Sequence, residues 1–365
     1  MLKPDYDAVA EMFAERARLR EGDQVLIQAH DEGTPLTEAM TLACFRRGAV
    51  PLTLIAQEET QARVFREISA ENVARPPAHL AALLEKTDVI FYLYSQNKNP
   101  AILADVPAAK LAAAMRGRTA AREVTYDGRR RVIIADFPTR AQADFFGVDF
   151  ESYHDAFWSA LDVDYGALGR RVGAVAKLIR GSAEVRVTTA KGTDVRLNVK
   201  GRLVQEDNGT ISLPGEPDAD VILNLPTGEA CLAPAESGAD GKAVFDFAFI
   251  GGRRVRDLEV RFERGRARLA GAAEGFDRAR EYFAAGTGDP YLIAELGVGA
   301  NPALTAPCGS ILMDEKITGT VHLALGDNRS LGGANVSSIH QDMIILNPRV
   351  TCDGTLLMAE GQLKV

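Results

Sequence analysis

Short apolar runs separated by segments of helical periodicity make up the first half of this 365-residue chain. The runs are rich in β-branched and aromatic residues, as are strands buried on both faces of a parallel sheet. They occupy residues 23–30, 50–56, 88–95 and 130–137. Between the first two runs, Thr34-Pro35 opens a segment of helical periodicity that ends before Gly48. This alternation predicts an α/β domain built on a doubly wound, mostly parallel sheet.

The pattern changes near residues 180 to 183. Residues 184–201 alternate apolar and polar positions around Lys191-Gly192, as the two strands of an antiparallel hairpin do. Short strands and turn residues follow, with one helical segment at residues 274–286. We therefore predict an N-terminal α/β domain over residues 1–182 and an α+β domain rich in antiparallel strands over residues 183–365.

Composition and charge narrow the choice of partners. The chain is 46% hydrophobic and 25% charged, which is typical of globular proteins, and its formal net charge is −8. Nucleic acids and anionic membranes bind clusters of excess lysine and arginine, so we expect neither as a partner. A peptide or another small molecule fits better. The first residues carry no signal pattern, and the four widely spaced cysteines suit reduced thiols, so we expect a cytoplasmic protein.

Candidate chemistry concentrates in the second half, around two histidines. In "SSIHQDMII" a strand places His340 and Asp342 on the same face, where both can reach one metal ion. In "GTVHLALG" the same alternation directs His322 away from an apolar face, toward solvent or a site. A hydrogen-bonded pair or a surface position is the alternative interpretation of a His-x-Asp sequence.

Two glutamates lie where strand-like runs end in glycine-containing turns. Glu229 stands in "VILNLPTGEACLAP" and Glu295 in "YLIAELGVGANP", both among apolar residues. A buried carboxylate is costly unless a cation, a set of donors or water compensates it. The glycines after Glu295 lack a third partner for a dinucleotide loop and are expected to shape the backbone beside it. Cys231 could share a strand face with Glu229, but we interpret it as a small hydrophobic residue.

The order of these motifs resembles a known family. "NLPTGE", "AELGVGANP", "DEKITGTVHLALG" and "GGANVSSIHQDMI" follow one another as in metallo-aminopeptidases of the aminopeptidase T and aminopeptidase S type, and the likeness runs from about residue 184 to the end. The resemblance implies a homodimeric aminopeptidase that releases N-terminal residues from peptides. It also implies that five residues hold two divalent metal ions per chain: Glu229, Glu295, His322, His340 and Asp342.

The implied ligands favour particular metals and a particular reaction. Carboxylates and imidazoles suit Zn, Co, Mn or Fe(II) better than soft metals. The positive charge of two dications exceeds the negative charge of three carboxylates, and the remaining positive charge would favour a bridging hydroxide as the nucleophile. A carboxylate must then carry the proton, and we take Glu295 and Glu229 as candidates, with Glu315 of "DEKI" as a supporting or structural residue.

One departure from the family pattern concerns catalysis. The family places a catalytic tyrosine shortly after the "HIALG" histidine, whereas this chain has no tyrosine from residue 292 onward and has Arg329 near that place. Arg329 could donate to a developing oxyanion or bind a carboxylate of the substrate, and a solvated loop arginine is the alternative.

Two other functions remain open at the level of sequence. Ring-cleaving dihydroxypyridine dioxygenases resemble the same fold, and His322, His340 and Asp342 could hold a single Fe(II). A glutamate in "AELG" fits the peptidase pattern better. A non-catalytic binding protein on this scaffold is the third hypothesis. Outside these motifs, His30 at the end of an expected strand is interpreted as a structural, hydrogen-bonded histidine.

Overall fold

The computed structural model describes residues 1–94, 97–103, 105–216 and 219–365. The chain forms two compact units. The parallel-sheet unit contains Met1–Leu161 and Gly209–Leu225, and the curled-sheet unit contains Asp162–Asn208 and Pro226–Val365. This division differs from the predicted domains 1–182 and 183–365 in two segments, residues 162–182 and 209–225.

The parallel-sheet unit is the predicted doubly wound α/β structure, and its strands follow the order β2-β1-β3-β4-β8, all parallel. Its strands are β1 (Gln24–His30), β2 (Val50–Ala56), β3 (Val89–Leu93), β4 (Arg131–Ala135) and β8 (Ile222–Leu225). Its helices are α1 (Tyr6–Arg16), η1 (Asp31–Gly33), α2 (Thr34–Arg46), α3 (Glu58–Glu67), α4 (Ala70–Val73), α5 (Ala78–Glu85), η2 (Pro100–Leu103), α6 (Ala108–Gly117), α7 (Thr119–Thr125), α8 (Arg140–Phe146) and α9 (Phe150–Leu161). The expected strand at 88–95 ends at Leu93, and residue 95 lies outside the described residues.

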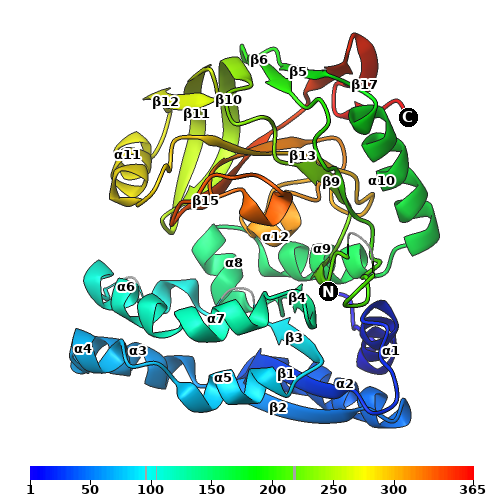
Figure 1. The fold of residues 1–365 in the computed structure, drawn as a ribbon, viewed down its shortest axis with the longest axis vertical. Helices are drawn as coiled ribbons and strands as arrows, with labels where there is room; N and C mark the ends of the chain where they lie inside the picture. The colour runs from blue at the N-terminus through cyan, green and yellow to red at the C-terminus, as the bar shows by residue number, and fades with distance from the viewer. Residues whose placement is uncertain (95–96, 104, 217–218) are drawn as a thin grey trace. The chain divides into compact units, whose positions relative to one another are not determined.

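Helices cover both faces of this sheet (Figure 1). On one face, Leu84 of α5 and Ala121 of α7 pack against Ile90 of β3. On the other face, the ring of Phe13 from α1 lies against Phe91 of β3, which points oppositely to Ile90. β1, β3 and β4 are largely buried on both sides, as the sequence pattern predicts, whereas every residue of the edge strand β2 is partly or fully exposed.

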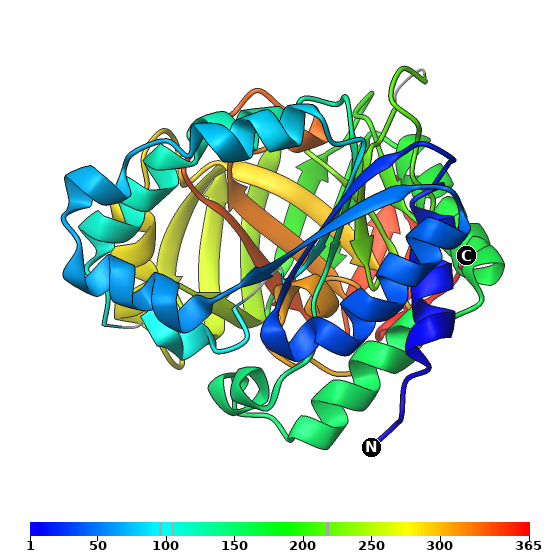
Figure 2. The ribbon, with the colours of Figure 1, turned by 90° about the horizontal axis from the view of Figure 1, so that it is seen from below.

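The curled-sheet unit is built on a long, mostly antiparallel sheet. Its order is β18-β17-β16-β5-β6-β10-β15-β14-β13-β9-β7, and β11 and β12 extend it from β10. The strands are β5 (Glu184–Thr188), β6 (Asp194–Asn198), β7 (Gln205–Asp207), β9 (Glu229–Leu232), β10 (Ala239–Ile250), β11 (Arg253–Glu263), β12 (Arg266–Gly271), β13 (Ile293–Gly299), β14 (Val321–Gly326), β15 (His340–Ile345), β16 (Arg349–Cys352), β17 (Thr355–Ala359) and β18 (Gln362–Leu363). Figure 2 shows how strongly its long strands β10 and β11 bend.

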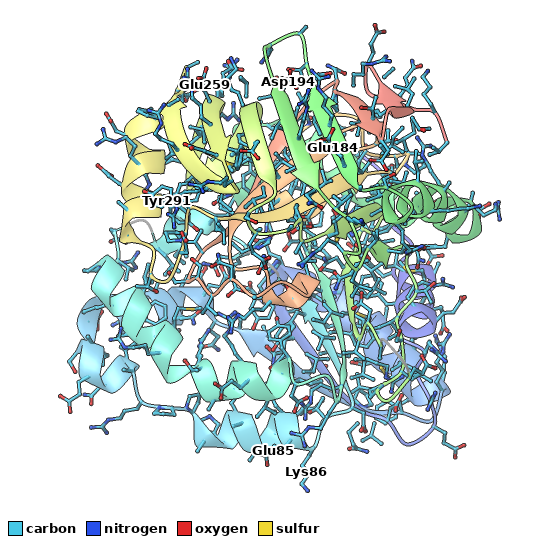
Figure 3. The ribbon with its side chains drawn as sticks, turned by 45° about the horizontal axis from the view of Figure 1, so that its top comes forward. Glu85, Lys86, Glu184, Asp194, Glu259 and Tyr291 are labelled. Atoms are coloured by element: carbon cyan, nitrogen blue, oxygen red, sulfur yellow. The ribbon has the colours of Figure 1, made fainter. Side chains whose placement is uncertain are left out.

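Four helical segments accompany this sheet: α10 (Tyr165–Arg180), α11 (Phe276–Ala285), α12 (Ile311–Asp314) and η3 (Arg329–Leu331). The predicted hairpin is present as β5 and β6, where Figure 3 labels Glu184 and Asp194, and the predicted helix at 274–286 is α11. Val172 and Ile179 of α10 belong to the same hydrophobic core as the strands of this sheet. Packing therefore groups α10 with the curled-sheet unit, although the helix precedes the predicted boundary.

The run "VILNLPTGEACLAP" contributes to both units. Its first part, β8, pairs with β4 in the parallel sheet, and its second part, β9, pairs with β13 in the curled sheet. Pro226 and Gly228, at φ +130°, lie in the short segment that separates them. None of the described helices is both long and apolar enough to cross a membrane.

Candidate metal centre

The five expected ligands lie on four adjacent strands, β9, β13, β14 and β15, of the curled sheet. Glu295 of β13 and Asp342 of β15 both pair in register with Ala324 of β14, from opposite sides. Residues in register share a face of a sheet, so both carboxylates project from the same face over a small side chain. His322 is two residues before Ala324 and projects from that face as well. The predicted common face of His340 and Asp342 is present in β15.

Glu295 lies between the two histidines. Its Oε1 atom is 3.4 Å from His322 Nε2, and its Oε2 atom is 3.0 Å from His340 Nε2. His322 Nε2 is also 3.3 Å from Glu229 Oε2, and His340 Nε2 is 3.5 Å from Asp342 Oδ2. The site therefore has two halves, one with Glu229 and His322 and one with His340 and Asp342, and one oxygen of Glu295 faces each half.

Two glycines of β13 make room for this arrangement. A Cβ atom at Gly297 would lie 2.0 Å from the ring of His322, and a Cβ atom at Gly299 would lie 2.1 Å from the carbonyl oxygen of Ile317. The first glycine admits an imidazole and the second admits the backbone of residues 315–317. The glycines shape the surroundings of Glu295 as expected, but they do so within β13, so the turn predicted directly after Glu295 was wrong.

A buried lysine next to Glu229 was not predicted as part of the site. Lys316 is 0% exposed, and its Nζ atom is 2.7 Å from Glu229 Oε1 and 3.5 Å from Asp207 Oδ2, with Glu315 as a third ion-pair partner. Glu315 and Lys316 are adjacent in the sequence, but the reach of Lys316 across to Glu229 depends on the close approach at Gly299. One ammonium group therefore offsets part of the negative charge of three carboxylates.

The close carboxylates and imidazoles shift one another's pKa values. Burial by itself raises the pKa of Glu295, but hydrogen bonding to His322 and His340 outweighs burial and holds the pKa well below its usual range. Burial opposes protonation of both histidines, yet Glu295, Glu229 and Asp342 raise the pKa of His322 to about 9. Asp342 and Glu295 likewise raise the pKa of His340 to about 12. Protons thus occupy positions where a cation is favoured, and a bound metal would displace them.

The pKa values of Glu229 and Glu315 are raised, whereas that of Glu295 is lowered. Burial raises the pKa of Glu229 to about 8, against the opposing attraction of Lys316, and burial also raises the pKa of Glu315. A buried carboxyl group with a raised pKa can accept and return a proton near neutral pH.

His340 is oriented from outside the site. Its Nδ1 atom lies 2.6 Å from the backbone oxygen of Asp327, which fixes the tautomer that donates from Nδ1 and leaves Nε2 free as a ligand. The carboxylate of Asp327 pairs with Arg329, whose side chain is 60% exposed on η3. Arg329 is thus connected to His340 through Asp327 and offers most of its guanidinium group to solvent.

The donor set fits a metal. Glu229 Oε2 and Asp342 Oδ1 are buried carboxyl oxygens that accept no hydrogen bond. Such oxygens are costly unless a cation compensates them. The described part of the chain also brings possible ligand atoms within 4.8 Å of one another in three groups: Glu229, Glu315 and His322; Glu229, Cys231 and Glu295; and Glu295, His322 and Asp342.

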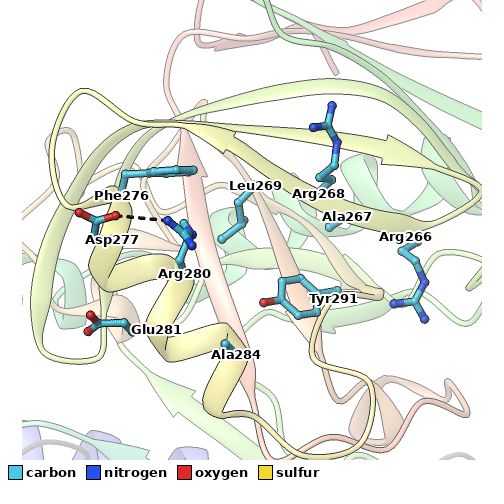
Figure 4. A pocket seen from close by; sticks show the side chains of 10 residues that line it. All are labelled: Arg266, Ala267, Arg268, Leu269, Phe276, Asp277, Arg280, Glu281, Ala284 and Tyr291. Carbon is cyan, nitrogen blue, oxygen red and sulfur yellow. Dashed lines mark ion pairs between the residues drawn. The ribbon is translucent and has the colours of Figure 1, made fainter.

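A separate cavity of about 860 Å³ lies between β12 and α11 (Figure 4). It is lined by Arg266, Ala267, Arg268, Leu269, Phe276, Asp277, Arg280, Glu281, Ala284 and Tyr291. None of the metal-ligand candidates is among these residues. Arg280 pairs with Asp277 and Arg266 with Asp289, so two of its arginines already have carboxylate partners. We therefore place the chemistry at the metal centre.

Comparison with known proteins identifies the family of the chain. The sequence model of the thermophilic metalloproteases, M29, matches residues 5–363. The chain belongs to this metallopeptidase family. The predicted relationship is confirmed, and it extends over both units. Membership makes the protein a hydrolase that depends on a divalent metal. A search of curated proteins found no relative.

Two solved structures show the same fold over nearly the whole chain. Wild-type AmpT from Thermus thermophilus is 21% identical, with a TM-score of 0.79 over 99% of both chains. The 2,5-dihydroxypyridine dioxygenase from Pseudomonas putida KT2440 is 15% identical, with a TM-score of 0.64 over 98% of this chain and 96% of that one. The predicted fold class, an α/β layer followed by a unit rich in antiparallel strands, is confirmed.

Proposed function

We propose that the protein is an aminopeptidase that removes N-terminal residues from peptides with two divalent metal ions, of which Zn, Co or Mn suit the ligands. The observation that carries this proposal is the position of Glu295, whose two oxygens face His322 and His340 separately. A carboxylate placed in this way suits a bridge between two ions. Glu229 and His322 would hold one ion, and His340 and Asp342 the other.

When bound, the ions would polarise the scissile carbonyl group and supply a bridging hydroxide as the nucleophile. The side chains have separate tasks in this proposal. Glu295 stays ionised between the two halves, because both histidines lower its pKa. Glu315 carries the proton to the leaving amine, since its carboxyl lies beside Glu229 and His322 and burial raises its pKa. Glu229 serves as a ligand steadied by Lys316.

Arg329 is proposed to bind the substrate. Its guanidinium group is mostly exposed and is held on one side by Asp327, two residues away. An arginine fixed in this way can donate to a carboxylate or to an oxyanion that develops during hydrolysis. A homodimer located in the cytoplasm belongs to the same proposal and rests on the family resemblance alone.

A single-iron dioxygenase that uses His322, His340 and Asp342 is the second candidate. The distances around His340 favour it, because Asp342 lies beside that histidine. Membership of the metallopeptidase family and the participation of Glu229 favour the peptidase. A binding protein without catalysis would keep the ligands and show neither reaction.

The test combines metal content with two assays. The chain is purified without added metal, then loaded anaerobically with Zn, Co, Mn or Fe(II), and assayed for hydrolysis of aminoacyl amides and for oxygen uptake with an aromatic diol. Two ions per chain with hydrolysis support the proposal, whereas one iron with oxygen uptake replaces it. His340→Ala should lose one ion and the activity, while His79→Ala, a change at an exposed histidine, should lose neither. Absence of metal under every condition would refute both enzymatic functions.

A further inference from the structure

Cys231 faces the metal centre from β9. It follows Glu229 by two residues on the same strand face, and it pairs in register with Gly297 of β13. Gly297 in turn pairs with His322 of β14. A cross-strand row therefore runs from the thiol to the imidazole, and the residue between them has no side chain to separate them.

The neighbours of the thiol on the side of the metal centre are mostly polar. The Sγ atom, one carboxylate oxygen of Glu229 and one of Glu295 lie within 4.8 Å of one another. The thiol also donates to Oε1 of Gln205, its partner in register on β7, at 4.0 Å. Ala233 and Leu331 pack against the same side chain, which is 5% exposed. Cys231 is thus a buried thiol with a purely apolar environment on only part of its surface.

A second observation points to a ligand at this place. Glu229 is only 4% exposed, its Oε2 atom accepts no hydrogen bond, and one of its carboxyl oxygens belongs to the group that includes the Cys231 sulfur. Lys316 satisfies the other oxygen, Oε1, at 2.7 Å. One carboxyl oxygen of Glu229, 3.3 Å from His322 Nε2, is therefore left without a hydrogen bond, in a place where a cation would satisfy it.

We propose that Cys231 is a sulfur ligand to the ion on the β9 side, the one that Glu229 and His322 would hold with Glu295. On coordination the S–H bond breaks, its proton passes to solvent, and a sulfur lone pair goes to the ion without any change of oxidation state. A thiolate added to two carboxylates makes this position select a thiophilic dication of the zinc class over manganese or magnesium. This inference rests on the proposed metal centre and names the metal class of one half of it.

The test uses cobalt as a spectroscopic probe. Metal-free wild type, Cys231→Ser and Cys352→Ser are titrated with Co(II) while absorbance is recorded in the near ultraviolet. Cys352 is the matched control because it is equally buried in the same unit, on β16. We expect a sulfur-to-cobalt charge-transfer band in wild type and in Cys352→Ser, and no such band in Cys231→Ser. A band that survives Cys231→Ser overturns the inference.

Affinity provides a second readout. Cys231→Ser should weaken zinc binding by about 10-fold or more, as measured by competition with a chromophoric chelator, and should weaken manganese binding much less. Equal losses for both metals contradict the inference. X-ray absorption of zinc-loaded wild type needs no variant and should show a sulfur neighbour at about 2.3 Å. Cobalt bound to wild type without a charge-transfer band refutes the sulfur ligand alone, whereas failure of wild type to bind any metal refutes the proposed function as well.

Discussion

Gly297 lies directly opposite His322 in the β13–β14 pair, at a distance that leaves no room for a Cβ atom beside the imidazole ring. Gly297→Ala would place its methyl group 2.0 Å from ring atoms and must push His322 out of line with Glu295. We expect at least about a 10-fold loss of metal affinity, because misplaced ligands bind weakly. Isothermal titration of metal-free protein with zinc measures this loss.

Gly271→Ala is the matched control for that substitution. Gly271 ends β12, and a Cβ atom there would meet nothing within 4 Å. Its zinc affinity should equal that of wild type. Unchanged affinity in Gly297→Ala would mean that the His322 side chain is not held in its place by contact with this glycine.

Lys316→Met should destabilise the metal-free curled-sheet unit by about 3 to 5 kcal/mol, because it leaves buried carboxylates without their ammonium partner. Added zinc should recover part of the loss, since a cation then compensates Glu229. Denaturant unfolding with and without zinc at neutral pH measures both effects. Lys242→Met removes a surface pair with Glu259 and should change the free energy of unfolding by about 1 kcal/mol at most. Equal effects of the two substitutions would contradict the compensating role of Lys316.

His30 should make the parallel-sheet unit less stable in mild acid. Burial lowers its pKa from 6.5 to about 4. As the pH falls below about 6.5, His30 becomes protonated in the unfolded chain, whereas in the folded chain it stays neutral until about pH 4. The free energy of unfolding therefore falls between these two pH values, by up to about 3 kcal/mol. His30→Gln should remove this part of the pH dependence.

His79→Gln serves as the control for this pH effect, because His79 is exposed on α5. The comparison is made by urea unfolding at several pH values between 4 and 7, followed by a probe in the parallel-sheet unit. The prediction fails if His30→Gln and His79→Gln keep the same slope of stability against pH.

Arg329→Ala should impair turnover without loss of metal. The side chain is 60% exposed and does not serve as a ligand, so thermal stability and metal content should stay at wild-type values. We expect kcat/KM for aminoacyl amides to fall by about 10-fold or more, in keeping with the loss of a charge-assisted hydrogen bond of about 1.5 to 3 kcal/mol. Arg280→Ala removes a comparably exposed arginine, 64% exposed and paired with Asp277, and should leave kcat/KM unchanged. Full activity in Arg329→Ala would show that Arg329 is a solvated loop residue without a role in catalysis.

Local patterns predicted elements well and their partners less well. The four parallel strands and the β5–β6 hairpin follow from runs and alternation that their own residues carry. The periodicity of α10 also predicts a helix, but it contains no information about which sheet that helix covers. Likewise, "VILNLPTGEACLAP" shows a break at Pro226 and Gly228, whereas the pairing of β8 with β4 is a long-range contact that the local sequence does not encode.

In the metal centre, too, local sequence predicted some features and long-range packing determined the others. Alternation along β15 predicted that His340 and Asp342 share a face, and the order of motifs indicated Glu229, Glu295 and His322. The buried Lys316 and the orientation of Cys231 depend on which strands lie side by side and on the missing side chains at Gly297 and Gly299. Such details arise from packing between segments far apart in the chain.

The return of residues 209–225 to the parallel sheet sets an order for folding during synthesis. When β4 has been made, its outer edge stays open until β8 is made, and α10 together with β5 to β7 is synthesised in between. The nascent chain therefore carries an unpaired strand edge beside a half-made second unit, a state prone to pairing with other chains. A chain cut at residue 161 or at residue 182 would keep that edge permanently, so we expect either fragment to aggregate unless β8 is supplied with it.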